Sequence, residues 1–263
     1  KIANSPAANP TAQSKYNTWS EVSIQHSDMF EAVDGTEGAA TLAQALESGL
    51  TYVDTAPYYG FGLSERRVGD GLRGKDCVLS TKVGRLLRPG LTAEAAAMGW
   101  PQALPFHPVF DYSYDAIMRS LEESLQRLGL EKIDLLYAHD IGPVTHGKDA
   151  TRHFRDLAES GYRALDSLRQ SGQITAIGLG VNEAQVCLDA LAVGDWDVFL
   201  LAGRYTLLEQ DPLDDLLPQC VERSISLVIG GPFNSGILVG GDTWNYDAAP
   251  DTVRAKVRRL EAV

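Results

Sequence analysis

The stretch YVDTAPYYGFGLSERRVG, residues 52–69, contains the strand–loop–helix unit that recurs along the whole chain. Residues 50–53, largely apolar, are typical of a buried strand, and Ser64 can cap a helix that runs through Leu72. Between them the strand ends on Asp54, whose carboxylate is costly to bury unless a cation lies beside it. We therefore expect a strand followed by a helix, with a cationic partner close to Asp54.

The same alternation of strands and helices continues on both sides of this stretch. Further helices are expected to begin at Thr36, Ser113 and Asp211-Pro212, and to lie around residues 153–171 and 184–193. Gly129 is expected to end the helix that begins at Ser113, and Gly172 the helix around residues 153–171. The expected strands are a weak one, EVSIQ (21–25), followed by LTYVDTA (50–56), DCVLSTKV (76–83), KIDLLYAHD (132–140), ITAIGLGVN (174–182), WDVFLLAGRY (196–205) and ISLVIGGPF (225–233).

Several of these strands, such as 133–137 and 226–229, are nearly continuous apolar runs, which is typical of parallel strands buried on both faces. A doubly wound sheet and a barrel both fit this alternation. The polar residues favour the barrel, because the C-terminal ends of barrel strands meet in one pocket. These strand-end residues are Asp54, Lys82, His139, Asn182 and Arg204. We predict an α/β fold, a (β/α)8 TIM barrel.

The predicted domain organisation is simple. Residues 1–18, rich in Ala, Pro, Asn and Ser, are expected to form an irregular N-terminal segment, and residues 19–263 a single barrel domain. Strand eight and its helix are not visible before residue 263. We therefore expect the natural protein to be longer, by roughly the 30 or more residues that one further helix–strand–helix unit requires.

The composition excludes several classes of partner. The 263 residues carry 35 acidic and 23 basic side chains, a net charge of -12, which disfavours nucleic acid and anionic membranes as main partners. No apolar run approaches the length of a membrane-spanning helix. The three cysteines lack ligand spacing, so no metal site is predicted. We expect a cytoplasmic protein that acts on a small molecule; its oligomeric state is left open.

Three residues at strand ends, Asp54, Lys82 and His139, form a candidate catalytic group with Tyr59 of the loop that follows Asp54. Lys82 ends the strand after Asp54 and is the expected partner of that carboxylate. Tyr59 can fold back over the same end of the sheet, where His139 arrives from the following strand. A nearby ammonium favours the phenolate and lowers the pKa of Tyr59, so that the phenol becomes usable in proton transfer. This chemistry suits a carbonyl/alcohol oxidoreductase. Asp54 and Lys82 alone could instead be a structural ion pair.

These residues resemble the aldo-keto reductase family. The matching motifs are DTAPYYG, the Lys82 of TKVG and the His139 of YAHD, followed by GLGVNE, RYTLLEQ and PFNSGIL. The resemblance is strongest to the branch with aldose 1-dehydrogenases, L-fucose dehydrogenase and pyridoxal 4-dehydrogenase. It implies that Tyr59 donates or accepts the proton, that Lys82 and His139 tune it, and that Asp54 pairs with Lys82. It further implies oxidation of a cyclic hemiacetal to a lactone with NADP or NAD.

The resemblance also implies where the cofactor binds, although this chain lacks the side chains that usually hold the nicotinamide in the family. The turn PFNSG, which contains Pro232, Asn234, Ser235 and Gly236, would receive the pyrophosphate through backbone amides and the Ser235 hydroxyl. The usual nicotinamide-holding side chains are replaced by Gly180-Val181, Ala202 and Gly230, so Asn182 is the candidate for that role. A catalytically silent, regulatory or binding module with the same fold is the alternative function.

The segment 86–112 is long for a loop of a barrel and carries three aromatic residues, Trp100, Phe106 and Phe110. A disordered insertion and a substrate lid both fit; the aromatic residues favour the lid and make these three the candidate substrate-binding residues. Tyr58 is expected to be a wall residue. GDGLRG (69–74) follows a helix and precedes a strand, so we interpret it as a helix end. His107, His146 and His153 share no ligand spacing and are expected to be solvated.

Overall fold

The computed structural model describes residues 21–23 and 34–262 of the chain. Its residues fall into two compact units, Lys1–Gly178 and Leu179–Val263, which are described one at a time. The expected irregular segment 1–18 lies outside the described residues. The single domain expected over residues 19–263 stays a prediction.

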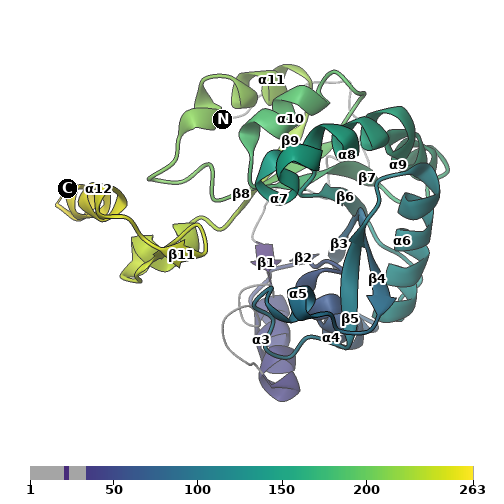
Figure 1. Ribbon diagram of the computed structural model, residues 1–263. Coiled ribbons are helices and arrows are strands. Elements are labelled where there is room, and N and C mark those ends of the chain that lie inside the picture. The colour runs from purple at the N-terminus through teal and green to yellow at the C-terminus, as the bar shows by residue number, and fades with distance from the viewer. Residues whose placement is uncertain (1–20, 24–33, 263) are drawn as a thin grey trace. The chain divides into compact units, whose positions relative to one another are not determined.

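The first unit contains a parallel sheet in the order β1-β2-β3-β6 (Figure 1). Residue Asp54, at the end of β2, lies opposite Ser80 of β3, and Lys82 of β3 lies opposite Tyr137 of β6. Each strand therefore offers its C-terminal residues to the same edge. The strands are β1 (Glu21–Ser23), β2 (Tyr52–Asp54), β3 (Val78–Val83) and β6 (Leu135–His139), and β7 (Ala176–Val181) crosses the boundary between the units.

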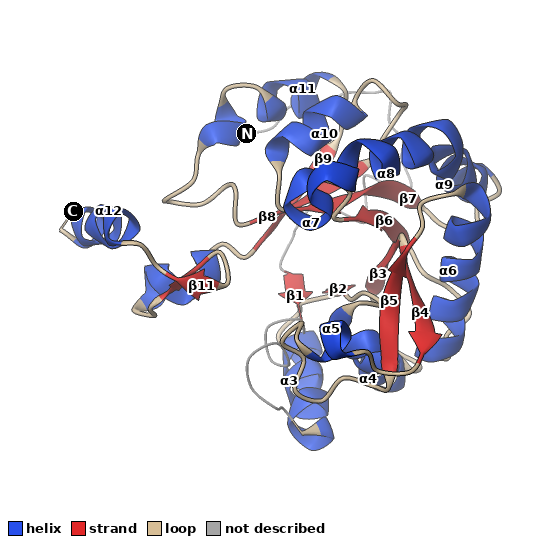
Figure 2. Cartoon of the chain, in the orientation of Figure 1, coloured by secondary structure: helices blue, strands red, loops and turns tan. Residues whose placement is uncertain are grey.

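The helices of the first unit lie outside its strands (Figure 2). Gly69 of α4 faces the end of α6 so closely that a Cβ there would meet the Leu128 carbonyl oxygen at 1.7 Å, so this glycine permits the two helices to pack. GDGLRG accordingly closes a helix and begins no nucleotide-binding helix. The main helices are α3 (Gly35–Glu47), α4 (Leu63–Leu72), α6 (Tyr114–Leu128), α8 (Ala150–Asp156) and α9 (Tyr162–Gln170), the last two joined by a π-helical turn, Leu157–Gly161.

Two expected helix caps are wrong. The first helix is capped by Asp34, whose carboxylate accepts the backbone amides of Thr36 and Glu37, so Thr36 lies inside the helix. The second begins after Gly62, and Ser64 uses its hydroxyl to bond that of Thr55 at 2.8 Å. In both cases a serine or threonine near the helix start was one of several residues able to cap it.

The segment 86–112 is not a loop without secondary structure. Strands β4 (Arg85–Pro89) and β5 (Phe106–Phe110) form an antiparallel hairpin, and the connection between them carries the short helix α5 (Ala93–Ala96) (Figure 1). Thr92 caps α5 through the amide of Ala95. The same unit also contains the short helix α7 (Pro143–His146). The hairpin corrects the interpretation of this segment as a loop and leaves its role as a lid a prediction.

The second unit continues the strand–helix alternation. Strands β8 (Val198–Ala202) and β9 (Ser226–Gly230) are parallel neighbours, and helices α10 (Ala184–Ala190) and α11 (Leu216–Glu222) precede β8 and β9 along the chain. Asp211-Pro212 begins a 3-10 turn, Asp211–Leu213, ahead of α11. After β9 come a 3-10 turn (Asn234–Val239), the short strands β10 (Thr243–Trp244) and β11 (Asp247–Ala248), and α12 (Asp251–Glu261).

The hydrophobic core follows the expected pattern. Helix α6 buries Ile117, Leu121 and Leu128 on one face, and β6 is buried along its full length. Apolar side chains at helical spacing thus cover strands that are apolar on both faces. The predicted α/β class is confirmed. Within the described residues, no helix combines the length and the apolar character needed to span a membrane.

Candidate active site

A buried ion pair joins the ends of β2 and β3. The Lys82 ammonium donates to an Asp54 carboxylate oxygen, and both side chains are only 2% exposed. Lys82 also donates to the Thr55 carbonyl at 3.0 Å, and the Ser80 hydroxyl donates to the second Asp54 oxygen at 2.6 Å. A buried ion pair persists when further hydrogen bonds satisfy both charges. The cation expected beside Asp54 is therefore Lys82.

Tyr59 lies directly beneath this lysine. The Lys82 Nζ atom is 4.6 Å from the centroid of the Tyr59 ring, and that ring is buried. Backbone geometry puts it there: Gly60, Phe61 and Gly62 all have positive φ values, 58°, 51° and 96°. Such a left-handed run is accessible to glycine and costly for phenylalanine. The DTAPYYGFG loop therefore turns sharply, and Tyr59 returns over the strand ends.

His139 completes the cluster from the end of β6. Its ring lies 5.8 Å from that of Tyr59, centroid to centroid, and nearly perpendicular to it. Burial, followed by the charges of Arg85 and Lys82, holds the pKa of His139 well below its ordinary value. The imidazole is therefore neutral at physiological pH. Asp54, Lys82 and His139 at the strand ends and Tyr59 of the loop after β2 are thus brought together, as expected.

Sequence reasoning missed a second cation–carboxylate pair beside this cluster. Arg85, at the start of β4, donates from Nη2 to Asp140 at 2.6 Å, and the same Asp140 oxygen lies 3.4 Å from Nε2 of His139. The guanidinium also stacks on the Tyr58 ring, 4.1 Å from Cζ to centroid. Burial raises the pKa of Asp140, and the Arg85 charge opposes that rise. A signal was available: the arginine of TKVGR follows Lys82 by three residues.

The three candidate substrate-binding aromatics separate into two groups. Trp100 is buried in one cluster with Tyr59, its ring centroid 5.9 Å away, and Phe106 packs against the same cluster. Phe110 instead contacts His146, at 4.8 Å between centroids, and lies near the Arg85 guanidinium. Trp100 and Phe106 therefore border the Tyr59 cluster, whereas Phe110 borders the second ion pair.

Two histidines expected to be solvated are not. His153 is 5% exposed, and its ring stacks on that of His146 at 4.2 Å between centroids. The Tyr112 hydroxyl lies 2.9 Å from Nε2 of His146 and donates to the carbonyl of His139. Burial, with the neighbouring His153 and Arg85, lowers the pKa of His146 to about 4. His107 also has a partner, the Gly90 carbonyl at 2.7 Å. The burial of His153 and the partial burial of His146 arise from side-chain contacts, which ligand spacing does not report.

The second unit contains the candidate cofactor-binding residues. Asn234, Ser235 and Gly236 have positive φ values of 47°, 59° and 101°, a run of left-handed residues of the kind that forms anion-binding concavities. Asn234 is buried and fixed by Thr206 Oγ1 and the Gly203 carbonyl. Ser235 Oγ accepts the Tyr246 amide at 3.0 Å, which leaves its hydroxyl hydrogen available as a donor. Pro232 is exposed beside this turn.

Asn182 lies apart from that turn in its contacts. Its side chain donates to the Ala202 carbonyl at 3.3 Å, and its own carbonyl accepts from Arg204 Nε at 2.9 Å. Arg204 also donates to Asn245, the residue before Tyr246. The Arg204 guanidinium is thereby held at Asn245, and the next residue, Tyr246, bonds Ser235 through its amide. The turn and this cation fit the phosphate groups of a dinucleotide.

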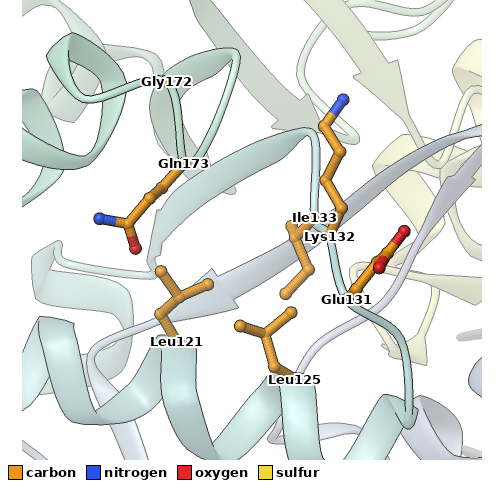
Figure 3. Close-up of a pocket in the computed structure, with 7 residues that line it drawn as sticks. All are labelled: Leu121, Leu125, Glu131, Lys132, Ile133, Gly172 and Gln173. Carbon is orange, nitrogen blue, oxygen red and sulfur yellow. The ribbon is translucent and has the colours of Figure 1, made fainter.

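One cavity of about 350 Å³ lies elsewhere in the first unit (Figure 3). The side chains of Leu121 and Leu125 of α6 point toward Ile133, and the Lys132 amine points away. Ile133 precedes β6, whereas His139 ends it, so the cavity is at the opposite end of that strand from the candidate catalytic cluster. The residues lining it are Leu121, Leu125, Glu131, Lys132, Ile133, Gly172 and Gln173.

Comparison with known proteins identifies a family. The sequence model of the Aldo/keto reductase family matches residues 21–262. A pyridoxal 4-dehydrogenase from Microbacterium luteolum is 45% identical over 251 residues, covering 89% of this chain and 73% of the relative. A D-threo-aldose 1-dehydrogenase from Pseudomonas sp is 37% identical over 251 residues, covering 90% of this chain and 73% of the relative.

Solved structures agree on the fold. The chain resembles the holo form of an aldo-keto reductase from Bacillus halodurans, with a TM-score of 0.69 at 24% identity, over 91% of this chain and 70% of that one. A glycerol dehydrogenase from Gluconobacter oxydans gives a TM-score of 0.67 at 22% identity, over 92% and 72%. These likenesses confirm the predicted (β/α)8 class, and the chain covers 70% and 72% of the two solved structures.

Proposed function

Since the chain belongs to the Aldo/keto reductase family and is an oxidoreductase, we propose that it moves a hydride between NAD or NADP and a carbonyl or hemiacetal carbon, with Tyr59 transferring the accompanying proton. The observation that carries this proposal is the Lys82 ammonium, 4.6 Å from the centre of the Tyr59 ring and bonded to Asp54. The proposal assigns a role to each of the four clustered residues.

Tyr59 is the general acid or base, depending on the direction of the reaction. The positive charge of Lys82 stabilises the phenolate, so a proton leaves the phenol more readily than it does in water. Asp54 and the Thr55 carbonyl keep the ammonium in place. General acid–base catalysis by a positioned group contributes about 10²–10⁴ in rate.

His139 is a neutral hydrogen-bonding group in this scheme. A charged imidazole beside Lys82 would repel that ammonium, and burial of His139 disfavours the charged form. Its neutral ring can hold the substrate oxygen without delivering a proton to it. Proton transfer is thereby left to Tyr59.

The cofactor is assigned to the second unit. The nicotinamide supplies or accepts the hydride when it is bound. The turn with Pro232, Asn234, Ser235 and Gly236 would hold the phosphates, assisted by the charge of Arg204, and Asn182 would contact the nicotinamide. The left-handed backbone run and the available hydroxyl hydrogen of Ser235 support this assignment.

We infer that the substrate is a cyclic hemiacetal, because the relatives at 45% and 37% identity are named for pyridoxal and for an aldose. In this oxidation Tyr59, as the phenolate, would accept the proton of the hemiacetal hydroxyl, and the carbon–oxygen bond would become the carbonyl of a lactone, with the hydride of that carbon taken up by a bound nicotinamide. Trp100 and Phe106 would line the substrate side of Tyr59. Phe110, which contacts Arg85 and His146, would lie further from Tyr59.

A panel of aldoses and pyridoxal, each with NAD and with NADP, tests the proposal through the absorbance of the reduced nicotinamide. We expect oxidation of at least one hemiacetal and a preference for one of the two cofactors. The absence of turnover on all panel members, together with no cofactor binding in a fluorescence titration, would favour the silent binding module instead.

A further inference from the structure

Three polar atoms around the Tyr58 ring carry no hydrogen bond within the part of the chain that the structure describes. They are Arg85 Nε, Trp100 Nε1 and His139 Nδ1, and all three are buried. A buried N–H without a partner costs free energy, so such groups are kept where a ligand or another structural state satisfies them. Their concentration in one place points to a binding function.

Tyr58 contacts all three side chains. The distance from its ring centroid is 4.1 Å to Arg85 Cζ, 5.6 Å to the Trp100 ring and 6.1 Å to the His139 ring. Tyr58 is itself only half-buried. A molecule that displaces the Tyr58 ring would therefore meet two N–H donors, one of them cationic, beside the neutral imidazole.

The arginine is fixed in a way that favours a defined acceptor. Asp140 takes its Nη2 hydrogen, and the rings of Tyr58 and Phe110 lie 4.1 and 5.5 Å from its centre, so Nε keeps its direction. Arg85 is 4% exposed. A guanidinium in this position binds an anionic oxygen more strongly than a neutral one, and the surrounding aromatic side chains suit a planar ring.

We propose that Arg85 is a specificity-determining residue that binds an ionised hydroxyl next to the reacting carbon of a planar aromatic substrate. This inference rests on the proposed hemiacetal oxidation and narrows its substrate class. It favours an aromatic hydroxyaldehyde in its hemiacetal form over a neutral sugar. Trp100 Nε1 donates a second hydrogen bond to the same molecule.

The test uses two compounds that differ only at that hydroxyl, pyridoxal and its 3-O-methyl ether. The unmodified protein should oxidise pyridoxal with the higher kcat/KM. Arg85→Gln should lower kcat/KM for pyridoxal by about 10- to 100-fold, as for loss of a hydrogen bond to a charged group, and change that for the ether by less than about threefold. Arg85→Lys, which keeps the charge, should recover part of the loss.

Two further variants separate specificity from folding. Arg88→Gln is the matched control, because Arg88 lies on the same strand, faces Glu123 at 3.6 Å and is partly exposed. The kcat/KM values of this variant for pyridoxal and for the ether should both equal those of the unmodified protein. Arg85→Gln leaves the partly buried Asp140 without its arginine, so Arg85→Gln with Asp140→Asn provides a neutral replacement of both partners. That double variant should fold and show the same selective loss. Equal losses on both compounds in the folded double variant would overturn the inference.

A binding measurement keeps this test separate from the proposed function. 4-Pyridoxolactone, the product expected from pyridoxal, retains the same hydroxyl and needs no turnover to bind. Titrated against tryptophan fluorescence, it should bind the unmodified protein at least tenfold more tightly than Arg85→Gln does. Tighter binding of the lactone to the unmodified protein than to Arg85→Gln, without turnover of any substrate, would uphold the role of Arg85 and refute the catalytic proposal. Equal affinity of both proteins for the lactone would refute the role of Arg85 whether or not turnover occurs.

Discussion

The cations of two cation–carboxylate pairs, Lys82–Asp54 and Arg85–Asp140, lie three residues apart along the chain, and the pairs differ in how completely their hydrogen-bonding groups are satisfied. In Lys82–Asp54, both carboxylate oxygens have donors and the ammonium has a second acceptor, the Thr55 carbonyl. In Arg85–Asp140, the guanidinium keeps an unpartnered Nε among the described residues, and the carboxylate also faces His139. We conclude that the Lys82–Asp54 pair holds the Lys82 ammonium in a fixed position, whereas the Arg85–Asp140 pair leaves the Nε hydrogen of Arg85 available for a ligand.

The adjacent tyrosines follow the same division. Tyr59 lies under Lys82, and Tyr58 lies on Arg85. Each phenol ring is therefore next to a cation, so proximity to positive charge does not by itself distinguish them. Burial does: the Tyr59 ring is enclosed, whereas the Tyr58 ring is partly open to solvent. A charge acts more strongly on a neighbour in a less polar environment, which favours Tyr59 as the acid or base.

The largest expected effect comes from removing the proton at Tyr59. Tyr59→Phe should lower kcat by about 10²–10⁴, because it deletes the acid or base and little volume. The dissociation constant of the cofactor should stay almost unchanged, which a fluorescence titration measures. Tyr58→Phe is the matched control and should reduce kcat by no more than a few-fold. A comparable loss in both variants, or a larger one in Tyr58→Phe, would reassign the catalytic phenol.

The next largest effect is expected from breaking the Lys82–Asp54 pair. Lys82→Met should reduce kcat nearly as much as Tyr59→Phe and should lower the free energy of unfolding by about 3–5 kcal/mol, since the buried Asp54 carboxylate keeps only its Ser80 hydrogen bond and loses its cation. Denaturant unfolding and steady-state kinetics measure the two effects.

A double variant separates those two losses. Lys82→Met with Asp54→Asn removes both charges, so much of the unfolding free energy should return while kcat stays low. Recovery of kcat in the double variant would show that the ammonium is structural and has no part in the proton transfer.

The smallest effect concerns the pH dependence of stability next to the second pair. The pKa of His146 is lowered from 6.5 to about 4, so the folded protein binds fewer protons than the unfolded chain between these values. Stability is therefore present above pH 6.5 and lost as pH falls toward 4. His146→Gln should make the free energy of unfolding less dependent on pH in this window, as denaturant titrations at several pH values would show.

His107→Gln is the control for this measurement, because His107 bonds the Gly90 carbonyl and is remote from Tyr112 in its contacts. It should leave the pH slope of the unmodified protein in place. An unchanged slope in His146→Gln would mean that other groups, with His139 and His153 foremost, account for the acid sensitivity.

The strand–helix alternation and the residues at the strand ends were predictable because each depends on neighbours in the sequence. In KIDLLYAHD, residues 135–138 are an uninterrupted apolar run that ends at His139, and the expected strands match β2, β3, β6, β7, β8 and β9. The weak strand EVSIQ matches β1 over its first three residues, Glu21–Ser23, and its last two residues lie outside the described residues. Parallel strands then bring their last residues to one edge of the sheet. The clustering of Asp54, Lys82 and His139 therefore follows from their positions at the ends of strands.

The sequence by itself thus determined the α/β class, the order of the strands along the chain and the four residues of the candidate catalytic cluster. Only the tertiary structure decided that residues 85–110 form a hairpin, that His153 is buried against His146, and that Arg85 and Asp140 form a second pair. The physical reason is that periodicity reports which face of an element is apolar, whereas the state of a buried polar group depends on partners far away in sequence. Arg85 and Asp140 are 55 residues apart, and no local pattern connects them.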